Sequence, residues 1–407
     1  MTTFLGGTVL TYSKLSEACS RGGANALTSV TNLQPAAGTH ASVAPAKFVD
    51  RQESVFAFET RYIDGEPQTV VIIDSKQSAN NRAELALVHD IEAGNSVLSR
   101  MPRMRVTYPN GEEFSDLQLP HRFADGHLRA ATIDGVEATK HPAYKEVRNA
   151  TTDNITALVN AAPIAAVCGA WDSTRPKGQL RLPSALVGEV IGVLADQERS
   201  GKEQQSLRGG ARVDPLAMSV RLTPTDAKKL VDAQRDELSP NLVDKFETQI
   251  KKTKKGELIS ASPLGLGGIP PTLESLGGVS CRNIIRSWVL SFATLRQLRF
   301  GGTVEQDVAG RALLAALGVA LIARAEEELY LRANCHLVES GVPVVTLDKR
   351  FGETENLKPF TVEASDALLA EALDKATSAG VVDWHGQVLE FRGDPVILSG
   401  AIEKSEA

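Results

Sequence analysis

The sequence predicts an α+β fold, because strand-like and helix-like segments are interleaved along its 407 residues without the regular spacing of a doubly wound sheet. The strand-like segments are short and rich in β-branched residues, and the helix-like segments repeat apolar residues every three or four positions. The composition fits a folded chain with a substantial core, since 42% of the residues are hydrophobic and 23% are charged.

In the first half of the chain, apolar runs predict strands, and the turn dipeptides Asp64-Gly65 and Asn110-Gly111 predict hairpins. The helical spacing of Leu85, Val88 and Ile91 predicts a helix. The expected elements are a short helix over 15–19, strands over 25–33, 55–62, 69–73, 103–108 and 113–119, and a helix over 80–91.

In the second half, residues 150–169 are interpreted as a helix that breaks near Pro163 and leads into a buried strand. Residues 282–299 are interpreted as a helix whose apolar stripe leaves its arginines to the side. A glycine- and proline-rich loop is expected over 263–278. The remaining expected elements are a long helix over 304–332, a strand over 342–347, a helix over 365–377 and a hairpin over 381–391 around His385-Gly386.

The cysteines and the apolar runs disfavour secreted and membrane proteins. The four cysteines lie far apart without a C-x-x-C pair, so we expect reduced thiols and neither a disulfide framework nor a zinc site. The N-terminal segment lacks the basic and apolar regions of a signal peptide, and the longest apolar run, 312–323, is too short to cross a bilayer. We therefore expect a soluble, cytoplasmic protein without a membrane partner.

The distribution of charge is uneven. The net charge of −6 argues by itself against nucleic-acid binding, which depends on neutralising phosphates. The field at one surface matters more than the sum, however. Residues 93–111 and 275–304 contain several arginines and no acidic residue. This asymmetry favours an anionic partner without establishing one.

The motifs of common enzyme classes are missing from the sequence. It has no P-loop, no complete dinucleotide-binding fingerprint, no G-x-S-x-G elbow and no H-x-H or HExxH pattern. Asp74 and Asp172 each end a predicted apolar strand beside a serine, where an active-site carboxylate could lie. An aspartate in that place more often caps a helix or forms a turn. We therefore expect no catalytic residue, no metal site and no cofactor.

A candidate anion-binding turn lies in the segment VVIIDSKQSANNRAEL, between a buried strand and a helix. Asp74 or Ser75 can cap the helix, and its first turn offers backbone N–H groups to a phosphate. Cations and neutral hydrogen-bonding groups follow, which suits an RNA backbone read through phosphate and 2′-hydroxyl groups. An ordinary capped helix start is the alternative. The candidate residues are Lys76, Gln77, Ser78, Asn80 and Arg82.

A second candidate is the loop WDSTRPKGQLRLP, which follows the apolar stretch 164–170. An aromatic side chain beside cations is typical of a stacking platform for unpaired bases. A tryptophan at a strand end is often part of the core instead, so both interpretations stay open. The candidate residues in this loop are Trp171, Ser173, Arg175 and Lys177.

Several segments resemble, in order, the segments of one protein family. VVIIDSKQSANNRAEL resembles its D-S-x-Q-S-x-A-N-R-x-E signature, although Asn80-Asn81 alters the spacing slightly, and GAWDSTRPKG resembles its W-D-S-x-x-P-K-G loop. SLRGGARVDPLA, the run from GLGGIPP to GGVSCRNIIRSWVLSFATLRQLRF, and LRANCHLV resemble further segments. From about residue 30 to 340, the sequence is similar to the RAMP-type backbone proteins of type I-G (formerly I-U) CRISPR systems, a divergent branch of the Cas-seven group.

This resemblance implies a ferredoxin-like (RRM-like) palm with an inserted hairpin and helical elements. It also implies a non-catalytic subunit of a Cascade-type surveillance complex, which polymerises along CRISPR RNA and presents it for pairing with target DNA. The implied partners are CRISPR RNA, target DNA, further copies of the chain, other Cascade subunits and a helicase-nuclease. The hairpin at Asn110-Gly111 is a candidate for the protruding thumb of such subunits, and a plain sheet hairpin is the alternative.

On this interpretation, residues 1–195 form the first part of the palm, with a hairpin inserted near 100–140, and 263–350 form the second part with the long helix. Residues 196–262 form a charged insertion or flexible segment, and 351–407 add a C-terminal helix and hairpin without a family counterpart. Two other functions stay open: a target-cleaving RAMP ribonuclease that uses Asp74 or Asp172, and a small-molecule α/β enzyme. Further RNA-binding candidates are Arg208, Arg282, Arg286 and Arg332.

Overall fold

The computed structural model describes residues 7–51, 53–207, 218–254, 256–267 and 276–400. The chain divides into two compact units, one made of Met1–Gln205 with Val279–Ala407 and the other of Ser206–Gly278. The mixture of antiparallel sheets and helices confirms the α+β prediction.

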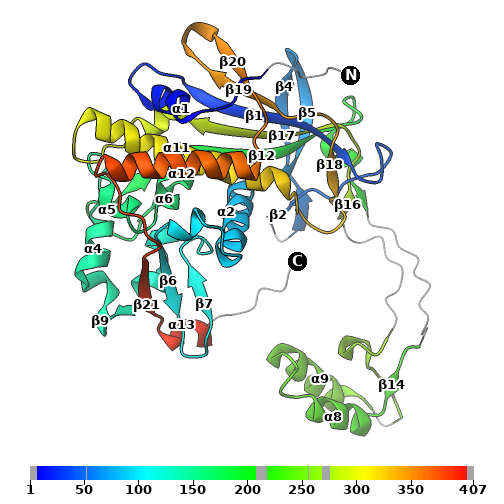
Figure 1. The fold of residues 1–407 in the computed structure, drawn as a ribbon. Coiled ribbons are helices and arrows are strands. Elements are labelled where there is room, and N and C mark those ends of the chain that lie inside the picture. Colours follow the sequence, from blue (N-terminus) through cyan, green and yellow to red (C-terminus); the bar gives the residue numbers. More distant parts are fainter. Residues whose placement is uncertain (1–6, 52, 208–217, 255, 268–275, 401–407) are drawn as a thin grey trace. The chain divides into compact units, whose positions relative to one another are not determined.

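An eight-stranded sheet forms the centre of the larger unit (Figure 1). Seven strands follow the order β20-β19-β1-β17-β12-β5-β4, each antiparallel to its neighbours, and β18 also pairs with β1. The strands predicted over 25–33, 69–73 and 342–347 are confirmed as β1, β5 and β19. The strands are β1 (Ala26–Pro35), β4 (Phe58–Ile63), β5 (Glu66–Asp74), β12 (Leu186–Leu194), β17 (Cys281–Ser291), β18 (Leu337–Glu339), β19 (Val344–Asp348) and β20 (Thr354–Leu357).

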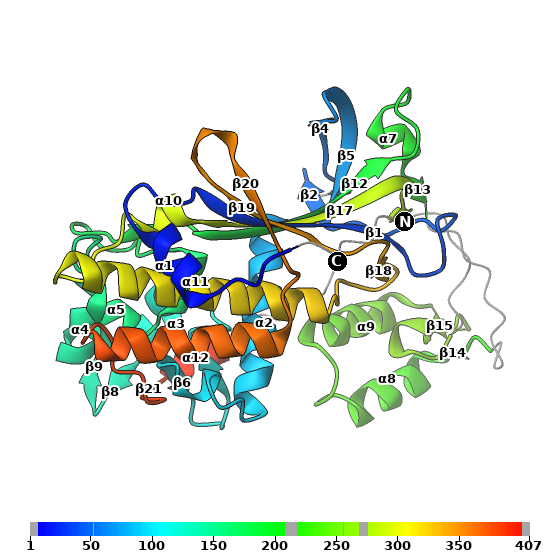
Figure 2. The same cartoon turned by 45° about the horizontal axis from the view of Figure 1, so that its top comes forward.

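Helices cover one face of this sheet, and the β19–β20 hairpin rises on the other side (Figure 2). The predicted helix over 80–91 is α2, which begins earlier because Ser75 Oγ accepts a hydrogen bond from the Ser78 N–H (3.4 Å). Thr303 and Gln306 form a capping box at the start of α11. The helices of this layer are α1 (Tyr12–Cys19), α2 (Lys76–Glu92), α10 (Phe292–Leu295), α11 (Val304–Glu327) and α12 (Val362–Ser378).

The central helix α11 approaches the sheet closely at Gly318. A Cβ atom at this position would lie 2.8 Å from Cδ1 of Leu290 on β17, so only glycine fits without a shift. Among the described residues, one helix, α11, has the length and apolar composition needed to cross a membrane. However, 94% of its apolar window is buried, as in a core helix. The helix ends at Glu327, and the prediction that it continues to residue 332 is wrong.

A second, five-stranded sheet has the order β7-β6-β21-β8-β9. The hairpin predicted around Asn110-Gly111 is present as β6 and β7, and β6 pairs on its other side with β21, in parallel. The hairpin is therefore part of a sheet, which agrees with the alternative of a plain sheet hairpin and not with a protruding thumb. The strands are β6 (Arg103–Thr107), β7 (Glu113–Ser115), β8 (Thr132–Ile133), β9 (Val136–Glu137) and β21 (Val388–Arg392).

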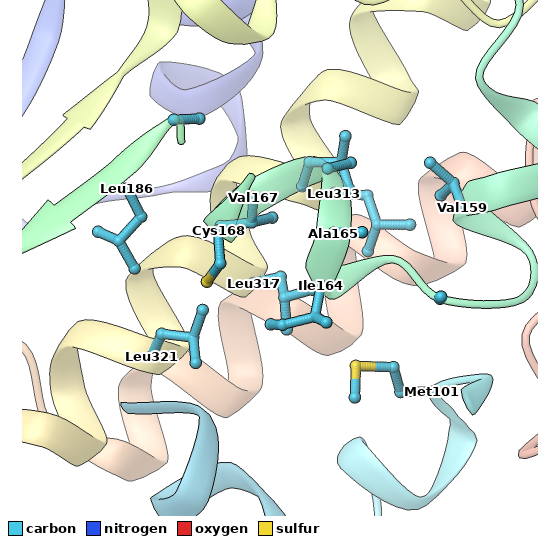
Figure 3. Close-up of a cluster of buried hydrophobic side chains, with 14 of the residues drawn as sticks. Met101, Val159, Ile164, Ala165, Val167, Cys168, Leu186, Leu313, Leu317 and Leu321 are labelled. Atoms are coloured by element: carbon cyan, nitrogen blue, oxygen red, sulfur yellow. The ribbon is translucent and has the colours of Figure 1, made fainter. Parts of the chain in front are cut away.

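The strand predicted after Pro163 is wrong: Ile164–Cys168 is a short helix, α6. Figure 3 shows its side chains directed toward Leu317 and Leu321 of α11, with Leu186 of β12 beside them. An apolar run this short and buried on all sides has the same pattern in either conformation, so periodicity could not separate the two. Burial raises the pKa of the Cys168 thiol well above its usual value.

The helix predicted over 282–299 is also wrong, since this segment contains the central strand β17 and then α10. Burial alternates along β17, with Ile284, Arg286, Trp288 and Leu290 directed toward the helices. The four-residue spacing of Ile284 and Trp288 fits a helix as well as a strand, and the pairing of β17 with β1 and β12 decides the conformation.

The hairpin predicted over 381–391 is replaced by the single strand β21. The residues before it pack inward, and Trp384 Nε1 donates a hydrogen bond to the carbonyl oxygen of Val159 (3.0 Å). Gly386 has a left-handed backbone conformation (φ 83°), and its N–H donates a hydrogen bond to the Arg100 carbonyl oxygen. The other short elements of this unit are α3 (Gly126–Arg129), α4 (Pro142–Arg148), α5 (Thr156–Val159), α7 (Gly201–Gln204), α13 (Pro395–Ser399), β2 (Lys47–Asp50), β3 (Glu53–Phe56), β10 (Ala170–Trp171) and β11 (Arg181–Leu182).

The smaller unit is built around two helices and has its own core. Ala227 and Val231 from one helix pack with Val243 and Phe246 from the other. Each helix has a proline in its first turn after a Thr or Ser cap. The residues expected as a charged segment over 196–262 supply most of this unit. Its elements are α8 (Pro224–Ala233), α9 (Pro240–Lys252), β13 (Ser206–Leu207) paired with β16 (Leu276–Gly278), and β14 (Arg221–Leu222) paired with β15 (Ile259–Ser260).

Candidate nucleic-acid interface

Asp74 organises the first cluster, at the junction of β5 and α2. Its carboxylate is buried and binds two guanidinium groups: Arg82 Nε donates to Oδ2 (3.2 Å), and Arg332 Nη2 donates to Oδ1 (3.3 Å). Arg82 also donates to the carbonyl oxygen of Tyr330 (2.5 Å), and Arg332 to that of Ile73 (2.6 Å). Two cations are thus fixed by one anion, which leaves a net positive charge.

The helix start adds groups that face solvent. Lys76 and Gln77 are exposed and Ser78 is half-buried. The first-turn N–H groups of a 17-residue helix carry its positive dipole end, which favours an anion. The ring of Tyr330 is 75% exposed beside this cluster. The first cluster, defined as Lys76, Gln77, Ser78, Arg82, Tyr330 and Arg332, therefore combines positive charge, neutral donors and an exposed aromatic ring.

Asn80 does not belong to this exposed group. Its side chain is buried, and Nδ2 donates a hydrogen bond to the carbonyl oxygen of Leu186 at the start of β12 (2.9 Å). Asn80 therefore attaches α2 to the sheet, and its assignment as a surface contact to RNA does not fit its position.

The second cluster is the loop between β10 and β11. The ring of Trp171 is 51% exposed, and the guanidinium carbon of Arg181 lies 5.0 Å from its centroid. Trp171 Nε1 donates to Gln179 Oε1 (3.3 Å), which fixes the ring. The tryptophan is thus a surface residue with a stacked cation, as expected of a platform for a base. The second cluster is defined as Trp171, Ser173, Arg175, Lys177 and Arg181.

The base of this loop is fixed by a second buried aspartate. Arg148 binds Asp172 Oδ2 through Nε (2.9 Å) and Nη2 (2.8 Å), and Thr174 Oγ1 donates to Oδ1 (3.1 Å). Arg175 donates to the Arg148 carbonyl and to Asn149 Oδ1 (2.8 Å). Arg175 is therefore partly committed to the loop itself, whereas Ser173 and Lys177 are exposed.

The structure brings both clusters to α2, but on its two flanks. Arg82 belongs to the first cluster, while Glu84 forms two 2.6 Å hydrogen bonds with Arg122, which also donates to the carbonyl oxygen of Gly169 (2.9 Å) beside the second cluster. Residues two positions apart point to nearly opposite sides of a helix. The two clusters therefore form two sites separated by the exposed face of α2, and not one continuous surface.

A known protein family matches the region of the chain that contains these sites. The model of the family described as CRISPR-associated protein GSU0053 matches residues 27–197. This match supports a CRISPR-associated RAMP protein. No curated protein matches the chain. The matched segment contains β5, α2 and the second cluster, so the family region includes most of the residues that form the two sites.

Three other candidate residues lie elsewhere in the chain. Arg286 is buried under the sheet, where it pairs with Glu339 (2.6 Å) and Glu326 (3.6 Å), so its guanidinium is not available to RNA. Arg282 is exposed on β17 and donates to Gln68. Arg208 lies outside the described residues.

Sequence reasoning missed four residues that shape the two sites. Tyr330 was assigned to a continuing helix, and its exposure follows from the end of α11 at Glu327. Arg122 and Arg148 act on residues 38 and 24 positions away, so no local pattern indicates them. Arg181 belongs to the loop WDSTRPKGQLRLP, which is its signal in the sequence, and the β10–β11 pairing places it opposite Trp171.

The two aspartates are poorly placed for the chemistry of a nuclease. Both are buried, and each has both oxygens occupied by arginines or a hydroxyl group. A catalytic carboxylate must reach a metal ion, a water or a substrate proton. Within the described part of the chain, no three His, Cys, Asp or Glu side chains group in a way that could hold a metal ion.

Proposed function

We propose that this chain is a RAMP protein that serves as a non-catalytic backbone subunit of a type I CRISPR surveillance complex, where it binds CRISPR RNA and presents it for pairing with target DNA. The observation that supports it best is the pair of cationic, aromatic-bearing clusters along α2. Such surfaces bind the sugar-phosphate backbone and stack unpaired bases without reading their identity. The guide supplies specificity through base pairing.

The topology of the sheet supports the palm that this role requires. In a βαββαβ ferredoxin-like fold, the four strands lie in the order 4-1-3-2 with both helices on one face. Here β19-β1-β17-β12 follow that order, α2 lies between β1 and β12 in sequence, and α11 lies between β17 and β19. The β4–β5 hairpin then extends the palm beyond β12.

The acidic net charge is compatible with this proposal. Each copy needs to neutralise only a few phosphates, and copies that stack along one RNA gain affinity from cooperativity. Acidic surface elsewhere favours solubility in the cytoplasm, where we place the protein. The proposed partners are CRISPR RNA, further copies of the chain, other Cascade subunits and a helicase-nuclease.

The test is the salt dependence of RNA binding by the first cluster. In the double variant Lys76→Ala with Arg82→Ala, we expect weaker binding of single-stranded RNA by the full chain. Each lost phosphate contact on a single strand reduces the slope of log K against log salt by about 0.7, so the expected reduction is about 1.4.

Lys375→Ala removes an exposed lysine from α12 and is the matched control, with an expected slope equal to that of the unchanged chain. An unchanged affinity and slope in the double variant would contradict the site. Cleavage of complementary RNA with Mg²⁺ that depends on Asp74 or Asp172 would instead support a ribonuclease.

A further inference from the structure

The β19–β20 hairpin has an unusual residue in its turn. The hairpin turns Asp64-Gly65 and Asp134-Gly135 adopt left-handed backbone conformations, with φ of 54° and 83° and of 51° and 77°. Aspartate and glycine adopt this conformation more readily than other residues. Phe351-Gly352 adopts the same conformation, with φ of 62° and 77°. A bulky side chain is disfavoured there, so the turn itself does not account for a phenylalanine.

The ring of Phe351 is also left in solvent. It is 92% exposed, and the guanidinium carbon of Arg350 lies 5.0 Å from its centroid. The hairpin rises from the side of the sheet opposite the helices (Figure 2). Lys349 Nζ binds Glu355 Oε2 across the two strands (2.8 Å), which supports the base of the hairpin. The chain therefore presents an aromatic ring with a stacked cation on a supported hairpin.

We propose that Phe351 and Arg350 form a stacking platform for one unpaired base of bound RNA, an inference that rests on the proposed RNA-binding function. Backbone strain that folding does not require is typical of functional positions. A flat ring beside a guanidinium stacks on any base and also attracts its phosphate. The platform lies outside the family-matched residues 27–197, at the β20 edge of the sheet, whereas the first cluster lies at the end of β5, near the opposite edge.

Three substitutions at one position test the platform with the full chain and a single-stranded RNA of mixed sequence. Phe351→Asn supplies a residue suited to the turn, so we expect an equal or higher thermal unfolding temperature together with about 10-fold weaker RNA binding. Phe351→Trp should retain the affinity, because it keeps a stacking surface. Phe351→Leu should bind as weakly as the Asn variant, because it keeps the apolar character without the ring.

A direct readout is photocrosslinking of RNA that contains 5-iodouridine, which should label the peptide with Phe351 in the unchanged chain. Tyr62→Asn is the matched control, since Tyr62 is an exposed aromatic residue on β4 whose neighbour Arg61 is paired with glutamates; its affinity should not change.

Unchanged RNA affinity in Phe351→Asn, with salt-dependent binding intact, would overturn the platform and leave the proposed function standing. Full RNA affinity in Phe351→Leu would also overturn it and would indicate an apolar contact to a protein partner. If the unchanged chain bound no RNA, both proposals would fall.

Discussion

The buried pair of Glu84 and Arg122 couples α2 to the second cluster, so its removal should affect both stability and RNA binding. The side chains of Glu84 and Arg122 are only 2% and 13% exposed, and two 2.6 Å hydrogen bonds join them. Burial raises the pKa of Glu84, and Arg122 opposes that shift by favouring the charged carboxylate. The pair is thus stabilised mutually, and each charge depends on the other.

Glu84→Gln leaves the Arg122 charge buried with a neutral partner. Breaking a buried pair in this way costs about 3–5 kcal/mol, and the glutamine oxygen can still accept one hydrogen bond, so we expect a loss of about 2–4 kcal/mol. Removing both charges with Glu84→Met and Arg122→Met should cost less than Arg122→Met alone, because no charge then remains unpaired.

Urea unfolding followed by tryptophan fluorescence measures these losses, since Trp171 and Trp384 lie in the larger unit. The double-mutant cycle isolates the coupling between the two side chains. A loss below about 0.5 kcal/mol in Glu84→Gln, or a double variant less stable than either single one, would refute the reasoning from burial.

Two further changes test the core. Burial raises the pKa of Asp116 to about 7, so the folded chain holds its proton more tightly than the unfolded chain, and this group's contribution to stability is lost as the pH rises from about 4 to 7. The free energy of unfolding of Asp116→Asn, relative to that of the unchanged chain, should therefore increase over that pH range by at most about 1.4 kcal/mol per pH unit. Urea titrations at several pH values measure this difference, and a difference independent of pH would contradict the prediction. Gly188→Ala places a Cβ atom 2.3 Å from the ring of Trp288 and should lower the free energy of unfolding by about 1–3 kcal/mol, measured by urea unfolding. No change in stability would show that the ring can move aside.

The sequence indicated the surface around α2 better than the sheet that carries it. Ser75, the apolar run of β5 and the polar residues after it are local signals. They predicted a cap at Asp74 or Ser75 and most of the first cluster, although the helix was expected only from residue 80. β17 was mistaken for a helix because its apolar spacing fits both conformations, and only pairing with two neighbouring strands determines it. The same error made Arg286 a candidate for RNA binding: on a helix it would lie to the side of the apolar stripe, but on β17 it is buried beneath the sheet.

The contacts that fix the candidate site are mostly long-range, and sequence reasoning had no access to them. Asp172 was assigned to a strand end, but its partner Arg148 comes from α4, and the buried pair accounts for the aspartate without any catalytic role. Asn80 looked like a surface amide because it follows polar residues, yet the turn of α2 directs it to Leu186. Local composition thus identified the region, while tertiary packing decided which side chains remain available.

The neighbouring strands β12 and β17 are joined in sequence by the whole of the smaller unit. Leu194 pairs with Cys281 at the ends of these strands, and Ser206 pairs with Gly278 just beyond them. The chain thus leaves the sheet and returns to it at adjacent points, so the register of these strands does not depend on what the connection contains. Such an architecture allows this segment to be lengthened, shortened or exchanged during evolution while the sheet and both clusters along α2 stay unchanged.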